Sequence, residues 1–215
     1  RAAKWSRDGK RLYIAYEYSN NQWNTEVHQY RVQWAFHLDD MSHNNPQGMH
    51  VSEDGTHMYI CDYDDHRVFQ YHLSEPNEIR SAGFVTYFQV NNTSYRNHSG
   101  QIYGRYPTNP RGVGLSSDGN TLFVQGNYVV SQFALGTSFY VDSVGVGTTG
   151  YYYQWDDNDM RDIAFSYDGR KMFMIGEQHS RVYEFTLKFP YDINPTTSLR
   201  HPDVVAVVGM GTSTT

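Results

Sequence analysis

Aromatic side chains interleaved with amides and carboxylates are concentrated in three segments, at 16–26, 91–110 and 146–160. Aromatic rings cover the apolar C–H patches of sugars while amide and carboxylate groups bond their hydroxyls, and Tyr and Trp are also favoured in protein interfaces. We therefore expect these segments to bind a glycan or a protein. The candidate ligand-binding residues are Trp23, Tyr95, Tyr103, Tyr106, Tyr152, Trp155 and Asp157. The alternative is that these aromatics only pack long loops onto the domain.

Metal and nucleophile chemistry has little support in the sequence. Acidic clusters at 62–65 and 156–159 offer oxygen atoms to Ca²⁺, but neither has the spacing of a calcium loop, so we interpret them as solvated turn residues. The ten histidines are dispersed without the spacing of a zinc site. The single cysteine, Cys61, has no partner for a disulfide and reads as an ordinary strand residue. We expect no catalytic residue, no metal and no cofactor.

Composition excludes several classes of protein. The 215 residues include 39% hydrophobic and 16% aromatic side chains, which is enough for one packed domain and is unlike a disordered chain. The formal net charge is −6 and the 17 basic residues are scattered, which argues against a nucleic-acid partner. No apolar run approaches the roughly 20 residues of a membrane-spanning helix, so membrane insertion is not expected.

A four-residue motif, Ser-x-Asp-Gly, recurs at 6–9, 52–55, 116–119 and 166–169. Its aspartates are separated by 54 − 8 = 46, 118 − 54 = 64 and 168 − 118 = 50 residues, which indicates a repeat of about fifty residues with one insertion. An apolar triplet with an aromatic centre follows each copy. The central aromatics are Tyr13, Tyr59, Phe123 and Phe173. In the tetrad, Gly can adopt the positive φ of a tight turn, and the side chains of Ser and Asp can form hydrogen bonds with nearby backbone amides.

Each repeat contains four short apolar strands bounded by turn residues, as at 49–51, 58–61, 68–73 and 84–90. Four antiparallel strands per fifty residues are typical of a β-propeller blade. The prediction is an all-β chain, a single domain over 1–215. The four blades are expected at about 1–44, 45–107, 108–158 and 159–215.

Every unit contains its own fourth strand, the last two at 143–146 and 204–208, so no blade is shared between the two ends of the chain. Three arrangements remain open: a compact four-bladed ring, part of a larger ring, or an open array, which exposed strand edges disfavour. The chain starts inside a first strand, which leads us to expect further sequence upstream.

The segments 48–79 and 163–193 resemble the repeat SxDGTKMYV…VYQYxLSTPxDI of β-propeller proteins from marine bacteriophages and bacteria. Its Leu-x-x-Pro-x-acidic-Ile tail is present at 73–79 and 187–193, abbreviated at 135–139 and absent from the first unit. The resemblance implies a ring that usually has more than four blades and, in phages, association with the tail or virion. A broader likeness is to seven-bladed propellers that include sugar-lactone hydrolases, although the Pro of their Ser-Pro-Asp-Gly motif is missing here.

The three aromatic segments fall in the two classes of loop that emerge at one end of a propeller. We therefore expect a non-enzymatic repeat protein that serves as a structural and adhesive module of a phage virion or tail, or of a bacterial surface. Its expected partners are other virion or surface proteins, or a host-surface glycan, and a homo-oligomer is compatible with the pattern. Its expected location is the virion, or the extracellular space or cell surface.

Two alternatives stay open. The first is a lactonase-like hydrolase with its site at the mouth of the central channel, indicated only by His50 and Asp162 on first strands. The positions equivalent to His50 hold Lys4, Gly114 and Ala164, and those equivalent to Asp162 hold Gly48 and Gly112. The second alternative is a purely architectural subunit that binds no soluble ligand.

Overall fold

The computed structural model describes the backbone and side chains of residues 43–90, 109–126, 129–145, 159–179 and 181–194. It also describes the side chain of Tyr13 and the backbone of strands at 2–5, 12–19, 23–30, 35–37, 95–96, 102–103 and 149–152. The regular elements of these residues are strands and two 3₁₀ helices, η2 (Ile79–Ser81) and η3 (Val141–Ser143). Within the same residues, no helix has the length and apolar character needed to cross a membrane.

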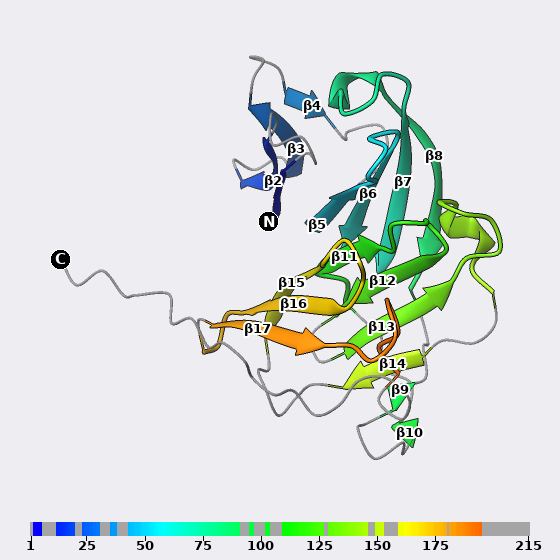
Figure 1. Ribbon diagram of the computed structural model, residues 1–215. Helices are drawn as coiled ribbons and strands as arrows, with labels where there is room; N and C mark the ends of the chain where they lie inside the picture. The colour runs from blue at the N-terminus through cyan, green and yellow to red at the C-terminus, as the bar shows by residue number, and fades with distance from the viewer. Residues whose placement is uncertain are drawn as a thin grey trace.

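The strands form four sheets that follow one another along the chain (Figure 1). Sheet I is β1 (Ala2–Trp5), β2 (Leu12–Ser19), β3 (Trp23–Tyr30) and β4 (Ala35–His37). Sheet II is β5 (Pro46–Val51), β6 (His57–Asp62), β7 (Arg67–Leu73) and β8 (Ala82–Gln89). Sheet III has the order β10 (Ile102–Tyr103), β9 (Tyr95–Arg96), β14 (Thr149–Tyr152), β13 (Val129–Ala134), β12 (Thr121–Gln125) and β11 (Gly112–Leu115). Sheet IV is β15 (Met160–Phe165), β16 (Lys171–Gly176) and β17 (Arg181–Thr186).

The all-β prediction is confirmed, but the predicted propeller of four four-stranded antiparallel blades is wrong. The described sheets have four, four, six and three strands. The insertion at 91–110 supplies β9 and β10, and β9 joins the edge of sheet III by pairing parallel to β14. An insertion that the repeat pattern treats as a loop therefore extends a neighbouring sheet. The predicted blade boundaries stay a prediction.

The predicted last strands of the third and fourth units have different outcomes. In the third unit the strand predicted at 143–146 is wrong over its described residues, 143–145, because η3 ends at Ser143 and an isolated bridge joins Val144 to Leu135. β13 pairs with β12 on one side, and on the other side it pairs with β14, further along the chain. The strand predicted at 204–208 lies outside the described residues.

Sheets II and III bury apolar side chains on both of their faces, because successive residues of a strand point to opposite faces. In β6, Met58 and Ile60 pack into the core shared with sheet I, whereas Tyr59 and Cys61 pack into the core shared with sheet III. In β12, Phe123 lies in the core shared with sheet IV while its neighbours face sheet II. The cores therefore lie between consecutive sheets.

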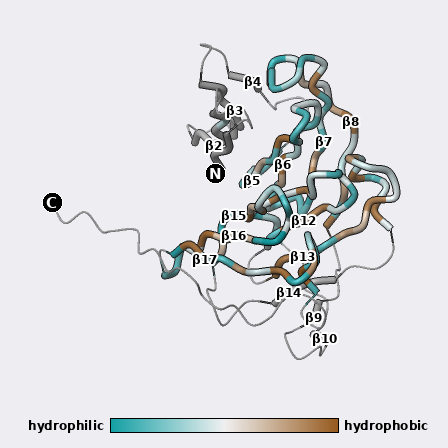
Figure 2. The backbone as a smooth tube through the Cα atoms, in the orientation of Figure 1, coloured by the Kyte–Doolittle hydropathy of each residue, from teal (hydrophilic) through white to brown (hydrophobic). Residues whose placement is uncertain are grey.

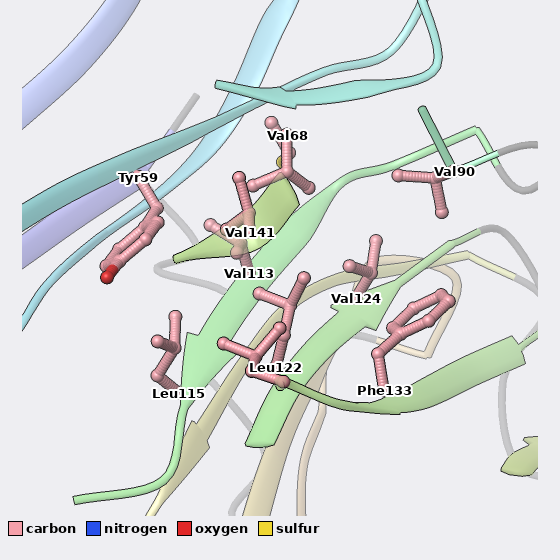
Figure 3. Close-up of a cluster of buried hydrophobic side chains, with 11 residues drawn as sticks. Tyr59, Val68, Val90, Val113, Leu115, Leu122, Val124, Phe133 and Val141 are labelled. Atoms are coloured by element: carbon pink, nitrogen blue, oxygen red, sulfur yellow. The ribbon is translucent and has the colours of Figure 1, made fainter. Parts of the chain in front are cut away.

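The core between sheets II and III shows this packing in Figure 3, where Tyr59 and Val68 of sheet II lie near Val113, Leu115 and Leu122 of sheet III. Apolar residues lie mainly on the strands, and hydrophilic residues lie mainly in the turns between them (Figure 2). No sheet has a dry core of its own, so its stability depends on the neighbouring sheet.

The first strands of the four sheets, β1, β5, β11 and β15, contact one another in sequence. Glycine makes the closest approaches possible. A Cβ atom on Gly48 would lie 2.8 Å from the Cα atom of Gly112, and one on Gly112 would lie 3.0 Å from the Cα atom of Asp162. Backbone therefore packs on backbone where β5, β11 and β15 meet.

The Ser-x-Asp-Gly tetrads form tight turns in all three sheets whose side chains are described there. In the second copy the hydroxyl of Ser52 donates to Asp54 Oδ1 (2.6 Å) and accepts from the amide of His57 (2.9 Å). The same bonds recur in the copies at 116–121 and 166–171. The glycines have φ values of 73°, 70° and 66°, which the sequence correctly predicts as positive.

The tail of each unit closes over its own tetrad and bonds to the preceding sheet. Asn77 and Phe139 have φ values of 63° and 67° and donate their amides to the carbonyls of Gly55 and Gly119. Their own carbonyls accept hydrogen bonds from Tyr13 (2.7 Å) and Tyr59 (2.8 Å) of the previous sheet. The third unit thus keeps a complete tail, although its sequence has no proline at Ser138.

Removing the glycine at Gly48 is expected to separate β5 from β11. Gly48→Ala places a methyl group against the backbone of Arg111 and Gly112, which can yield only by moving a strand, so we expect a loss of about 1–3 kcal/mol in the free energy of unfolding. Gly83→Ala is the control, because a Cβ atom there meets nothing within 4 Å and the backbone is an ordinary exposed strand. Equal urea midpoints for the two variants would contradict the close-packing role of Gly48.

The tetrad aspartates should make the fold acid-sensitive. Partial burial raises the pKa of Asp54 and Asp118. Hydrogen bonds from the tetrad serine and from the residue directly after the tetrad glycine outweigh this effect, so each pKa is lowered in the folded state. For exposed Asp168 the bond from Ser166 lowers the pKa. A lowered folded pKa stabilises the fold above the unfolded pKa of about 3.9, and this stability is lost as the pH falls through the folded value.

We therefore expect wild type and Asp118→Asn to differ most in unfolding free energy near neutral pH, and the difference to decrease progressively as the pH falls below about 4. Urea unfolding at a series of pH values measures this difference. A gap between the two proteins that is the same at pH 7 and pH 3 would show that the Asp118 charge is not responsible.

Candidate active site

A cavity of about 550 Å³ opens where the carboxyl ends of β5, β11 and β15 lie side by side. Its lining comes from these strands, from two tetrad turns and from two tails. The lining residues are His50, Val51, Ser52, Glu53, Asn77, Gly114, Leu115, Ile163, Ala164, Phe165, Ser166, Tyr167 and Tyr191. In Figure 1 the three strands converge at the centre of the molecule. The cavity is large enough for a small organic molecule.

Small residues at one register position create this space. His50, Gly114 and Ala164 pair with Tyr59, Phe123 and Phe173 on the second strands, so they occupy equivalent places in sheets II, III and IV. A Cβ atom on Gly114 would come no closer than 3.9 Å to the side chains of Ile163 and Phe165. The cavity therefore exists because two of the three equivalent positions carry almost no side chain.

His50 is the titratable ring at this level. Its backbone is held by pairing with β6, its ring centroid lies 6.2 Å from that of Tyr59, and it is half-buried. An imidazole of this kind is suited to proton transfer near neutral pH. The structure thus places one of the two residues that indicated a hydrolytic site in the lining of the cavity.

Asp162, the other residue, does not line this cavity. It lies one position before Ile163 on β15, and its Oδ1 atom accepts the amide of Ile163 at 2.9 Å. Its Cα atom faces Gly112, at the level where the inner strands approach most closely. The structure therefore does not bring His50 and Asp162 together in one site.

The two lining serines are not arranged as nucleophiles. The Ser52 hydroxyl donates to Asp54, and the Ser166 hydroxyl donates to Asp168 at 2.6 Å. Both oxygens also accept backbone amides, so they are committed to the turns. Activation of a serine needs an adjacent base that takes its proton, and each of these protons is directed to a turn carboxylate. Water is the better candidate nucleophile here.

The other walls of the cavity differ in character. Glu53 contributes a carboxylate and Asn77 a carboxamide on the sheet II side. On the sheet IV side lie Phe165, Tyr167 and Tyr191, and the Tyr191 hydroxyl donates to the carbonyl of Tyr167 at 2.7 Å. Tyr167 is 65% exposed, so its phenol stands at the cavity mouth.

Sequence reasoning missed Glu53, Asn77 and Tyr167 as lining residues. A signal was present, because Glu53 and Tyr167 both fill the variable position of the tetrad, which holds Ser117 in the third copy. The sequence alone does not show that this position of the turn borders a cavity.

The predicted aromatic binding residues lie on other elements. Trp23 is the first residue of β3, and Tyr95, Tyr103 and Tyr152 belong to β9, β10 and β14, which are neighbours in sheet III. Tyr106, Trp155 and Asp157 lie outside the described residues. Their role in ligand binding stays a prediction.

Two of the acidic residues considered from sequence, Asp62 and Asp159, have structural partners. Asp62 is buried and accepts the backbone amides of Asn45, Asp64 and Asp65 at 3.0–3.1 Å. Asp159 pairs with Arg111 (2.8 Å) and Arg161 (3.0 Å). In the part of the chain that the structure describes, no three His, Cys, Asp or Glu side chains form a group that could hold a metal ion.

Cys61 faces the core, and burial raises the pKa of its thiol to about 12. The thiol is therefore protonated at neutral pH, which agrees with an ordinary strand residue.

No protein-family model matches the chain, and no curated protein matches it. Solved structures do. A candidate 6-phosphogluconolactonase from Bacteroides uniformis matches with a TM-score of 0.53 at 14% identity, over 97% of this chain and 55% of that one. Hydrazine synthase from Kuenenia stuttgartiensis matches with a TM-score of 0.54 at 12% identity, over 86% of this chain and 58% of that one.

A periplasmic gluconolactonase from Pseudomonas aeruginosa matches at 16% identity over 86% of this chain and 52% of that one, but its TM-score of 0.49 carries no argument. The chain spans about half the length of the solved structures it matches. At these identities the likeness establishes the fold alone.

These comparisons correct the expectation of a non-enzymatic structural and adhesive module of a phage virion, tail or bacterial surface. The two solved structures reported above with a TM-score over 0.5 carry the names of enzymes, a hydrazine synthase and a candidate 6-phosphogluconolactonase. The physical reason for the error is that repeat motifs specify turns and strands, which proteins of unrelated function share.

Proposed function

We propose that this chain is a hydrolase that opens a cyclic ester in the cavity between β5, β11 and β15. The observation that carries the proposal is the position of His50, an imidazole in the lining of a cavity of about 550 Å³ that its equivalents Gly114 and Ala164 leave open. The fold shared with a candidate 6-phosphogluconolactonase supports the same reaction class.

In the proposed reaction His50 acts as the general base. It takes a proton from water while the water oxygen attacks the ester carbonyl carbon, and the carbonyl π electrons move to oxygen to form an oxyanion. The carboxamide of Asn77 is a neutral group in the lining that could donate a hydrogen bond to this oxyanion. Collapse of the intermediate breaks the ring C–O bond, and the leaving alkoxide takes the proton from His50. The product is a hydroxy acid, and no external oxidant or reductant is needed.

Replacing His50 should abolish hydrolysis. His50→Gln keeps a polar side chain of similar reach but removes the base, so we expect kcat/KM for glucono-δ-lactone to fall on the order of 100-fold or more. His72→Gln is the matched control, because His72 is exposed on β7 and does not line the cavity. Release of acid, followed with a pH indicator and corrected for spontaneous hydrolysis, measures the rate. Equal activity in the two variants would remove His50 from the mechanism.

Filling the cavity should have the same effect without removing the base. Gly114→Leu projects a side chain into the open space beside Ile163 and Phe165, where the first atom meets no close neighbour. We expect activity to be lost while the melting temperature changes by only a few degrees. An active Gly114→Leu protein would show that the reaction, if present, takes place elsewhere.

A further inference from the structure

The face of sheet IV opposite sheet III carries apolar side chains that stay partly open to water. Met172 and Met174 on β16 are buried against sheet III. Because successive residues of a strand point to opposite faces, Phe173 and Ile175 lie on the other face, where Val182 of β17 pairs with Ile175. Phe173, Ile175 and Val182 are each partly exposed. These three residues define the outer face of sheet IV.

The same register positions are fully buried in sheets II and III, each of which has a following sheet. In sheet II they hold Tyr59, Cys61 and Val68, which have no exposed area and pack against sheet III. In sheet III two of these positions hold Phe123 and Val130, which are buried against sheet IV. Covering the outer face of sheet IV with another sheet would remove similar apolar area from water, which favours association.

One polar position distinguishes the outer face of sheet IV from its equivalents. In sheets II and III a glutamine accepts a backbone amide from the end of the next unit's tail. The pairs are Val141 with Gln70 Oε1 (3.0 Å) and Ile193 with Gln132 Oε1 (2.9 Å). In sheet IV this position holds Glu184, which accepts a hydrogen bond from Lys171 Nζ at 2.7 Å. The outer face of sheet IV therefore lacks the glutamine that holds a tail and suits a sheet whose unit has no tail.

Sheet I belongs to the unit whose sequence has no tail. Residues 31–34 join β3 to β4, whereas the longer segment 74–81 joins β7 to β8 and carries most of the tail. Leu12 and Ile14 hold on β2 the register positions of Met58 and Ile60 on β6. Met58 and Ile60 pack against the preceding sheet. Sheet I, the first of the described sheets, therefore has apolar residue types at the positions that contact a preceding sheet.

We infer that the outer face of sheet IV binds sheet I of a second copy of this chain, and that two copies form a dimer with twofold symmetry. Each copy presents both surfaces, so sheet IV of each copy contacts sheet I of the other and the assembly closes. Two copies also supply about the length of the similar solved structures, of which this chain spans 55% and 58%.

The dimer also affects the cavity. Ala164 pairs with Phe173, is exposed and lines the cavity, so the outer face of sheet IV begins at the cavity wall. In the dimer the second copy packs along this edge and adds a wall to the cavity. The inference rests on packing and does not depend on the reaction proposed for the cavity.

A charge on the outer face of sheet IV should weaken the dimer. Val182→Lys places an ammonium group where the interface excludes water, so we expect the dissociation constant to rise about tenfold or more. Val85→Lys is the matched control, because Val85 is 38% exposed on β8 of sheet II. Sedimentation velocity over a concentration series measures both constants. Melting temperatures within a few degrees of wild type confirm that both variants fold.

Cross-linking identifies the two surfaces independently of stability. Cys61 and Val124, the register equivalents of Ile175 and Ile14, lie in one core. We therefore expect a short bismaleimide to join an Ile175→Cys protein to an Ile14→Cys protein that carries a longer tag. The buried thiol of Cys61 is protonated and does not compete. Val85→Cys in place of Ile175→Cys is the control and should give no product.

A weaker dimer in Val182→Lys, together with a cross-link between positions 175 and 14, would support the inference. A wild-type chain that stays monomeric up to about 100 μM would overturn it, and this is the outcome expected if another segment or a different partner covers the face. A dimer that Val182→Lys leaves unchanged, or one that yields no such cross-link, would show that the copies associate through other surfaces and would overturn it equally. None of these outcomes depends on hydrolysis.

Discussion

Every feature of this protein depends on the face-to-face packing of small sheets, none of which can bury its apolar residues alone. Strand alternation in β6 sends Met58 and Ile60 to one neighbour and Tyr59 and Cys61 to the other, so removing one sheet exposes half of the next. Hydrogen bonds from Tyr13 and Tyr59 to backbone carbonyls in the tail of the next unit orient each sheet relative to the next. Together they fix the order and spacing of the sheets.

The cavity follows from that packing. Where the inner strands carry Gly48 and Gly112, backbone meets backbone and no space remains. Two residues further along, at the level of His50, the strands have separated and Gly114 and Ala164 do not fill the gap. The first strands are therefore close-packed at the level of Gly48 and separated two residues further along. His50 lies at this second, open level.

Sequence reasoning predicted much of the local structure and part of the candidate site. The strands of sheet II, the positive φ values of Gly55, Gly119 and Gly169, and the register of His50 with Gly114 all follow from the repeat. The pairing of β9 with β14 does not, because it joins two insertions that have no counterpart in the repeat. From the sequence, Asp162 and His50 are both candidate residues of a hydrolytic site. In the structure Asp162 lies where β11 and β15 are close-packed, and only the packing of the sheets shows this.

The sequence by itself determined the elements: tetrads that form turns, apolar strands that need neighbouring sheets, and a cysteine without a disulfide partner. These depend on contacts between residues near in the chain, or on residue type alone. Only the tertiary structure decided how many strands each sheet contains and that Glu53 and Tyr191 share a cavity with His50. Whether these residues share a cavity depends on the distance between the sheets. That distance is set by the volumes of many packed side chains, so no single position in the sequence encodes it.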